Sequence, residues 1–430
     1  MSTSPVLKDG VRPREVFAWA MYDFANSGYT TVVVTAVFNA YFVGVIAAGE
    51  DWGTFAWALA LSVSYALIIF TAPLLGAYAD AHAAKKKLLA ITTAGCVLGT
   101  ALLALVGPGE IALAFALIVF SNVFFGTGEN IAAAFLPELA RSEAMGKVSA
   151  WGWSLGYLGG LITLGVCLAY VTWAGGQGAT AAEYVPVTML ITAVMFAAAS
   201  SLTFLLLKER AVPQEAQKGA ALKALARVGQ TLSHARQFKD LLRFLGCLVL
   251  YQSGVQIVIA LSAIYAQQAM SFTTQDTIVL VLLVNITASL GAFFFGQWQD
   301  RLGHRKTLAF TLLGWCSMVA IAYLTTDRVG FWIAANIAGL CMGASQSAGR
   351  ALVGYLAPEN RHAEFFGLWG LAVKLASIIG PLTYGAITWF TGNDHRSAML
   401  FTGVFFVLGL VVLKSVDPER GRRAALAAGS

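Results

Sequence analysis

The 430-residue chain has few charged residues. Asp, Glu, Lys and Arg make up 12% of it, against roughly a quarter in soluble globular domains. Hydrophobic residues make up 58%, and the mean hydropathy is +0.71. Apolar residues occur along the whole chain, which excludes a single anchor attached to a soluble domain. At about 20 apolar residues per crossing, a dozen helices would use roughly 240 residues, so the composition predicts a polytopic membrane protein.

Residues that carry chemistry are also scarce. The cysteines lie in apolar runs without CxxC spacing, which indicates neither disulfides nor a thiolate metal site. The histidines fall in polar connections, so the usual ligands of an intramembrane metalloenzyme are missing. A GxxxxGK[ST] phosphate loop is absent from the sequence, and so is any nucleophile–base constellation. We therefore expect neither an enzyme nor an ATP-driven pump, and no cofactor or metal.

Apolar runs between charged or Gly/Pro-rich breaks predict an all-α membrane protein with twelve transmembrane helices. The runs span residues 18–47, 54–78, 88–106, 111–136, 148–173, 184–207, 242–268, 277–297, 307–325, 329–355, 364–390 and 397–414. The first fifteen residues are polar and lack the apolar region of a signal peptide, so the first helix is expected to direct insertion.

Lysine and arginine are divided unevenly between alternate loops. One set of loops, together with both termini, carries nearly all of them, whereas the other set carries only Arg328 and Arg396. The second set holds seven acids, namely Glu50, Asp51, Glu110, Glu183, Asp276, Asp327 and Asp394. The positive-inside rule then predicts cytoplasmic termini in a bacterial plasma membrane. The same asymmetry accounts for the net charge of +6, so a nucleic-acid partner is not expected.

A long polar stretch divides the twelve predicted helices six and six. The expected organisation is a cytoplasmic N-terminus, two halves separated by a basic linker, and a cytoplasmic tail, at residues 1–15, 16–207, 208–241, 242–415 and 416–430. Within the linker, Leu222, Leu225, Val228 and Leu232 recur at helical spacing. Two interpretations remain open, a basic amphipathic helix on the membrane surface and a solvated tether.

The two halves repeat at a nearly constant offset. The run Gly76-Ala-Tyr-Ala-Asp80 is echoed by Gly296-Gln-Trp-Gln-Asp300, 220 residues later. Pro358 echoes Pro137 at an offset of 221. Parallel six-helix repeats resemble the architecture of major facilitator transporters. The resemblance implies a substrate path between the halves near the bilayer midplane.

A loop motif carries this resemblance further. The second-half stretch 296–306 resembles the superfamily signature GxxxDRxGxRK at every fixed position, namely Gly296, Asp300, Arg301, Gly303, Arg305 and Lys306. The first-half copy keeps Gly76, Asp80 and three lysines, but Ala81 and Ala83 replace a basic residue and the glycine. Such motifs could close one face reversibly through helix approach, helix-dipole contacts and ion pairs. For Lys85–Lys87 a role in topology alone is the simpler interpretation.

A narrower resemblance covers residues 16–415. The stretches Trp19–Ser27, Gly152–Gly160 and Ala363–Gly367, the last followed by Lys374 and Gly380-Pro381-Leu382, resemble the bacterial branch of the fungal vacuolar amino-acid effluxer (autophagy-related permease) family. This resemblance implies efflux of amino acids. The chain departs from the family where Tyr-x-Asp-Gly-x-Gln is frequent, because it has Tyr251-Gln252-Ser253-Gly254-Val255-Gln256. A carboxylate that could bind a cation or proton is therefore missing.

Ionisable residues inside spans are functional candidates, because each costs several kcal/mol in hydrocarbon without partners or water. Lys374 lies about 15 Å into the eleventh predicted helix, near mid-membrane, and is the strongest candidate. The repeat places Glu129 opposite Arg350 and Trp153 opposite Lys374. Asp23 shares a helix face with Asn26. Two interpretations stay open for the charges, latching pairs between the halves and ligands for a charged substrate or a coupling proton.

Weaker candidates are uncharged. Gln252, Gln256 and Gln346 lie on helices expected to line the path, and Trp153 and Tyr157 share a face of the fifth helix. Gly152, Gly156 and Gly160 form a packing ridge. The sequence thus predicts a monomeric, proton-coupled secondary transporter of amino acids or similar polar solutes. Efflux of hydrophobic drugs is the alternative within transport, and a non-transporting receptor or scaffold is the alternative of another class.

Overall fold

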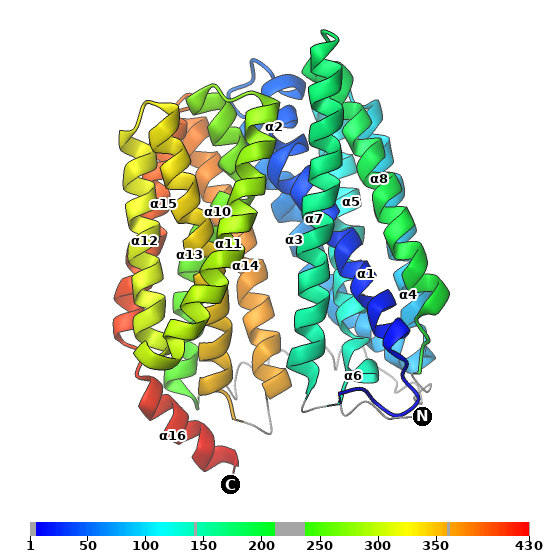
Figure 1. Cartoon of the computed structure of the whole chain (residues 1–430). Helices are drawn as coiled ribbons and strands as arrows, with labels where there is room; N and C mark the ends of the chain where they lie inside the picture. Colours follow the sequence, from blue (N-terminus) through cyan, green and yellow to red (C-terminus); the bar gives the residue numbers. More distant parts are fainter. Residues whose placement is uncertain (1–5, 142–143, 211–236, 359–361, 430) are drawn as a thin grey trace. The chain divides into compact units, whose positions relative to one another are not determined.

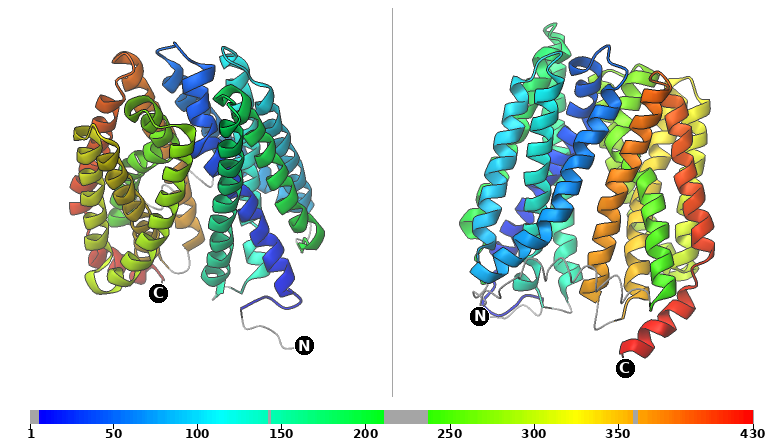
Figure 2. Two further views of the ribbon diagram at one scale, coloured as in Figure 1. Left: turned by 45° about the horizontal axis from the view of Figure 1, so that its top comes forward. Right: turned by 180° about the vertical axis from the view of Figure 1, so that it is seen from behind.

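The structure is a computed structural model that describes residues 6–141, 144–210, 237–358 and 362–429, and it is all-helical apart from one isolated bridge. The chain forms two compact units. Unit 1 comprises Met1–Ala48 and Val63–Leu225, and unit 2 comprises Gly49–Ser62 and Ala226–Ser430. Figures 1 and 2 show each unit as a bundle of long helices. The predicted amphipathic helix of the linker lies outside the described residues.

Unit 1 contains most of the N-terminal helices. In chain order these are α1 (Pro13–Tyr29), η1 (Thr30–Ala36), α2 (Phe38–Tyr41), η2 (Phe42–Ile46), α3 (Gly53–His82), α4 (Lys85–Leu102), η3 (Leu103–Leu105), α5 (Ile111–Ala133), α6 (Leu136–Leu139), α7 (Met145–Gly176) and α8 (Ala181–Leu206). The first turns of α3 group with unit 2, where Phe55 stacks on Trp389 with ring centroids 5.1 Å apart.

Unit 2 contains the C-terminal helices. These are α10 (Lys239–Met270), α11 (Thr274–Leu302), α12 (His304–Leu324), α13 (Arg328–Leu356), α14 (His362–Phe390), α15 (His395–Lys414) and α16 (Pro418–Gly429).

The twelve predicted spans all lie in helical segments, and the all-α membrane fold is confirmed. Among the described residues, eleven helical segments are long and apolar enough to cross a membrane. The remaining predicted span corresponds to α13, which has 29 residues but carries Asn336, Gln346 and Arg350. Most helices extend past the predicted apolar runs, as α10 does at both ends, because polar residues continue a helix beyond the hydrocarbon.

The first predicted span is not one regular α-helix. It passes from α1 into the π-helical segment η1, then through α2 into a second π-helical segment, η2. The amide of Val37 donates to the carbonyl of Val32, five residues back, at 3.0 Å. The Thr31 hydroxyl donates to the Ser27 carbonyl at 2.8 Å. Hydroxyl bonds of this kind compete with the backbone ladder, and the β-branched run at 30–35 crowds it further.

Small residues let α1 and α7 approach closely. A Cβ added at Gly156 would lie 3.0 Å from the Ser27 hydroxyl, and one added at Gly160 would lie 3.1 Å from a methyl group of Thr31. A Cβ added at Gly152 would collide with the Asp23 carboxylate. The predicted packing ridge is thereby confirmed, and it holds the helix that carries Asp23 and Asn26.

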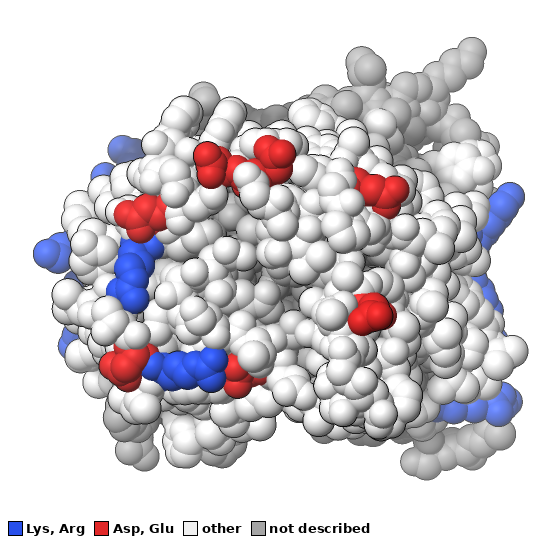
Figure 3. All heavy atoms as spheres, turned by 90° about the horizontal axis from the view of Figure 1, so that it is seen from above, with Lys and Arg blue, Asp and Glu red and all other residues white. Residues whose placement is uncertain are grey.

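The seven acids that the sequence assigned to one set of loops occupy connections or first turns at the ends of α3, α5, α8, α11, α13 and α15. Figure 3 shows acidic side chains at these ends of the helices. Both arginines predicted there are held by neighbours. Arg328 pairs with Asp276 at 3.2 Å, and Arg396 donates to the carbonyls of Tyr323 and Thr325 at 3.0 and 2.8 Å.

At the opposite ends of the unit 1 helices, the lysines of the first-half motif make structural contacts. Lys85 pairs with Glu138 at 2.9 Å, and Lys86 donates to the Leu207 carbonyl at 2.6 Å. The Glu209 carboxylate accepts the backbone N–H groups of Lys85 and Lys86 at 2.6 and 3.1 Å, at the positive end of α4. A role in topology alone therefore does not account for these two lysines.

Both copies of the loop motif have a residue with positive φ between their helices, although one residue connects α11 to α12 and two connect α3 to α4. Gly303, directly before α12, has φ of +82°, a conformation that favours glycine. Ala83, at the equivalent position 220 residues earlier, has φ of +47°. The degenerate copy thus has a positive φ at an alanine, where the second half has a glycine that adopts it readily.

We expect Ala83→Gly to stabilise the protein. A left-handed conformation costs an L-residue roughly 1–2 kcal/mol, so the substitution should raise the apparent melting temperature in detergent by about 1–2 °C. Ala90→Gly, on an exposed position of α4, is the matched control. It should lower the melting temperature, because glycine weakens a regular helix. An unchanged or lower melting temperature for Ala83→Gly would contradict the assigned strain.

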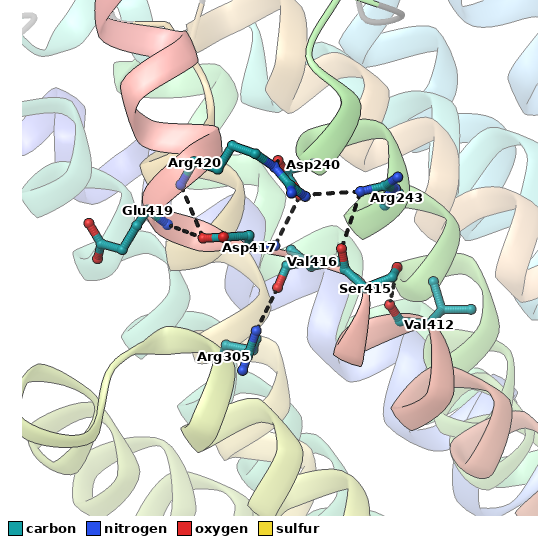
Figure 4. Close-up of polar contacts among 9 residues, drawn as sticks. All are labelled: Asp240, Arg243, Arg305, Val412, Ser415, Val416, Asp417, Glu419 and Arg420. Atoms are coloured by element: carbon teal, nitrogen blue, oxygen red, sulfur yellow. Dashed lines mark hydrogen bonds and ion pairs between the residues drawn. The ribbon is translucent and has the colours of Figure 1, made fainter.

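The segment expected to be a simple tail forms helix α16, which docks on unit 2 (Figure 4). The Arg420 guanidinium donates to both carboxylate oxygens of Asp240, at 2.7 and 2.6 Å, and Asp240 is only 4% exposed. The Asp417 amide also donates to Asp240, at 3.0 Å, and Arg243 lies 3.8 Å away. This ion pair raises the pKa of Arg420 above its usual value. We call Asp240, Arg243, Asp417 and Arg420 the C-terminal clasp.

Candidate functional site

Unit 2 contains a polar cluster between α10 and α13. Gln252 is 1% exposed, and its Nε2 donates to Oε1 of Gln346 at 3.1 Å. Oε1 of Gln252 and the hydroxyl of Tyr251 are buried and have no hydrogen-bond partner among the described residues. Leaving a buried polar atom without a partner costs about 1–3 kcal/mol. Oε1 of Gln252 is therefore an acceptor for a polar ligand, whereas the Tyr251 hydroxyl packs against Gly349.

Arg350 lies one helical turn after Gln346 on α13. Its guanidinium carbon is 5.2 Å from the centroid of the Trp369 ring on α14, a cation–π contact. The buried Nε1 of Trp369 has no hydrogen-bond partner within the described part of the chain. The sequence analysis missed Trp369. A tryptophan among many aromatics gives no signal of its own, and its pairing with Arg350 depends on how α13 and α14 pack.

Lys374, the strongest candidate from the sequence, lies on α14 and is half-buried. It is five residues beyond Trp369 on the same helix. Gln256 is half-buried on α10, one turn after Gln252. The structure thus places Gln252, Gln256, Gln346, Arg350 and Lys374 on three helices of one unit, and it joins Gln252 to Gln346 directly.

Unit 1 holds the acidic candidates. Asp23 is half-buried on α1, against the glycine ridge of α7, and Glu129 is half-buried on α5. Glu129 lies close enough to Asp23 for the two charges to interact. Two carboxylates in one unit give it a negative site that could attract a cation.

Asn26 is buried without hydrogen-bond partners for its side chain, which the sequence could not reveal. It is 6% exposed, and neither its Oδ1 nor its Nδ2 has a hydrogen-bond partner among the described residues. Burying an amide without compensation is costly inside a membrane-spanning helix. Asn26 therefore has the features of a ligand-binding residue, whereas an isolated amide in a sequence predicts only interhelical packing.

Trp153 and Tyr157 lie on α7 of unit 1. Their ring centroids are 6.2 Å apart, and the residues are 50% and 43% exposed. They form an aromatic surface on the helix that also carries the glycine ridge.

The predicted pairs Glu129 with Arg350, Asp23 with Lys374, and Trp153 with Lys374 each join residues of different units. They stay predictions.

The gating candidates are only partly described. Gly76 and Asp80 lie on α3, and Gly296, Asp300 and Arg301 lie on α11. The structure does not describe the side chains of Asp80, Asp300 and Arg301. Arg305 donates to the Val416 carbonyl at 3.0 Å, which ties the second-half motif to the chain before α16 (Figure 4). Gly303 forms the left-handed turn described above.

Solved transporters share this fold. The nucleoside transporter NupG matches with a TM-score of 0.70 at 14% identity, over 94% of this chain and 99% of that one. The D-xylose-proton symporter matches with a TM-score of 0.68 at 15% identity, over 95% and 98% of the two chains. With its membrane-spanning helices, the chain therefore has the fold of these major facilitator transporters.

The sequence narrows the class further. The chain belongs to the family described as vacuole effluxer Atg22 like, which matches residues 54–426. It is 27% identical to the uncharacterised MFS-type transporter YxiO of Bacillus subtilis (strain 168) over 421 residues, 94% of each chain. It is 24% identical to autophagy-related protein 22 of Saccharomyces cerevisiae (strain S288c) over 208 residues, which are 46% of this chain and 39% of the yeast protein. The predicted family is confirmed.

Proposed function

We propose that the protein is a monomeric, proton-coupled exporter of amino acids in the bacterial plasma membrane, with both termini in the cytoplasm. The observation that carries the proposal is the cluster of unit 2, where Arg350 lies on Trp369 and Gln346 bonds to Gln252. A guanidinium presents a planar fork of donors that suits a carboxylate. The cluster therefore supports recognition of an anionic group.

Unit 1 supports recognition of the other end of a zwitterion. Asp23 and Glu129 supply negative charge, and Asn26 supplies an amide without a partner among the described residues. In our proposal these groups bind the substrate ammonium, and one of the carboxylates also binds the coupling proton. The Asp that is frequent in the family is missing from α10, the seventh predicted span. In our proposal Asp23 and Glu129 are therefore the proton carriers.

The name of the matching family, vacuole effluxer, supports export as the direction. The uneven distribution of lysine and arginine supports cytoplasmic termini. Alternating access, with the two loop motifs closing one face, would couple substrate movement to the proton gradient.

Counterflow into proteoliposomes tests the substrate. We expect an unlabelled neutral α-amino acid inside the vesicles to drive uptake of the same labelled amino acid, and an imposed pH gradient to change the rate. The corresponding amine and the corresponding carboxylic acid are matched competitors, each lacking one charge. Both should compete at least about 10-fold more weakly, because a hydrogen bond to a charged group contributes about 1.5–3 kcal/mol. Equal competition by hydrophobic cations would instead favour the drug-efflux alternative.

A further inference from the structure

A cavity opens between α12 and α15, near the end of α12 that begins at His304 and the end of α15 at Lys414. It is lined by Arg305, Lys306, Ala309, Leu410, Leu413 and Lys414, and its volume is about 220 Å³. That is more than ten times the roughly 10–15 Å³ that one water molecule needs. Three of its six lining residues are cationic, none is acidic, and the other three are apolar.

The cations of this cavity are available. Lys306 and Lys414 are exposed and make no ion pair or hydrogen bond with any described residue. Arg305 donates one N–H to the Val416 carbonyl, and a guanidinium has five. The α12 N-terminus adds to the positive potential, because no side chain caps it and the first amides of a helix carry partial positive charge. The cavity therefore attracts an anion.

A second cavity at the same end of unit 2 has the cations Lys239 and Arg420 together with the acid Asp240 in its lining. It is about 150 Å³ in volume and includes Arg420, but this arginine is neutralised by Asp240 in the C-terminal clasp. The acid closest in sequence to the first cavity, Asp417, accepts the amides of Glu419 and Arg420 at 3.1 Å and so caps α16. The first cavity therefore differs from the second in having no acid among its lining residues.

The surface next to the cavity is apolar and exposed. Phe310, one turn after Lys306 on α12, is 56% exposed, and Val411, one turn before Lys414 on α15, is 57% exposed. Leu313 and Val407 continue these faces and are 52% and 50% exposed. Both helices are long and apolar enough to cross a membrane, so these exposed apolar side chains suit contact with acyl chains. A ligand for the whole surface needs an anionic head and an apolar tail.

We propose that Arg305, Lys306 and Lys414 bind the phosphate of an anionic membrane phospholipid, whose acyl chains lie over Phe310 and Val411. Basic pockets between transmembrane helices are suited to such headgroups. The site is separate from the polar cluster of the proposed substrate site, and it does not depend on which solute is transported. Because Arg305 also contacts Val416, a bound lipid would stabilise the second-half loop motif against the start of α16.

Lipid binding to the purified full-length protein tests the proposal. Native mass spectrometry would follow retention of phosphatidylglycerol and phosphatidylethanolamine titrated into the delipidated protein. We expect the wild type to bind phosphatidylglycerol in preference to phosphatidylethanolamine. Lys414→Gln should weaken phosphatidylglycerol binding about fivefold, the effect of one cation at a membrane surface, and Lys306→Gln combined with it about 25-fold.

Arg423→Gln is the matched control, because Arg423 is an exposed cation of α16 outside the cavity lining. It should leave phosphatidylglycerol binding within twofold of wild type, and all variants should melt at the same temperature in lipid-free detergent. Wild-type binding by Lys414→Gln, or an equal loss in Arg423→Gln, would overturn the site in favour of diffuse surface attraction. Full displacement of phosphatidylglycerol by millimolar inorganic phosphate would show that the cavity binds a soluble anion and would contradict lipid as its ligand.

Discussion

Lys374→Ala should abolish substrate counterflow and leave folded protein in the membrane. Lys374 is half-buried within α14, a membrane-spanning helix, on the same helix as Trp369. We expect it to bind the substrate carboxylate together with Arg350, and losing a charge-assisted hydrogen bond costs about 1.5–3 kcal/mol, or roughly 10- to 150-fold. Removing a charge from hydrocarbon does not itself oppose insertion. Flux in proteoliposomes and the monodisperse yield in detergent would be measured together.

Two variants on the same helix serve as controls. Lys374→Arg keeps the cation and should retain part of the flux. Ser377→Ala removes a buried hydroxyl that donates only to the Val373 carbonyl, at 3.0 Å, and should transport like wild type. Wild-type flux in Lys374→Ala would remove this residue from the proposed site.

Arg350→Lys should raise the KM for the substrate about 10-fold or more. Lysine keeps the positive charge but loses the fork of donors and most of the stacking on Trp369. Trp369→Leu should raise the KM by a smaller factor, about two- to fivefold, because an exposed cation–π contact contributes roughly 0.5–1 kcal/mol. The matched control is Trp332→Leu, which removes a ring that packs on Phe272, with centroids 5.6 Å apart, and should leave the KM unchanged.

Exchanging charges separates a substrate ligand from a latch. Glu129→Arg and Arg350→Glu should each lose flux. If Arg350 binds the substrate, the double exchange should remain inactive, because the carboxylate then meets a negative side chain. Restored flux in the double exchange would show that the two residues form a structural pair, the alternative left open by the sequence.

Much of the architecture could be predicted because hydrophobic length and loop charge are local properties of a sequence. The twelve apolar runs and the all-α fold needed only composition and spacing. The superfamily could be predicted from the loop motif that ends at Lys306, and the family from stretches such as Gly152–Gly160. The interruption of the first span could not be predicted, because the hydrogen bond from Val37 to Val32 depends on which backbone geometry prevails in a β-branched run. Hydropathy is the same for an α-helix and a π-helix.

The charged residues of the site could be predicted from the sequence, but the side chains that surround them could not. Charged residues in apolar runs, such as Arg350 and Lys374, stand out in any sequence. The ring beneath Arg350 and the missing partners of Asn26 are properties of packing. Helix α16 was also not predicted, although the sequence contains a signal for it. Pro418 after Asp417 is a typical helix start and could have been recognised.

The C-terminal clasp bears on how the protein can be shortened or fused for experiments. A chain cut after Lys414 would keep every membrane-spanning helix but would leave Asp240, 4% exposed, with Arg243 at 3.8 Å in place of the paired guanidinium of Arg420. That carboxylate lies in the first turn of α10, directly after the linker between the halves. Purification tags and reporter proteins are therefore better joined beyond Gly429, through a spacer, than substituted for the last helix.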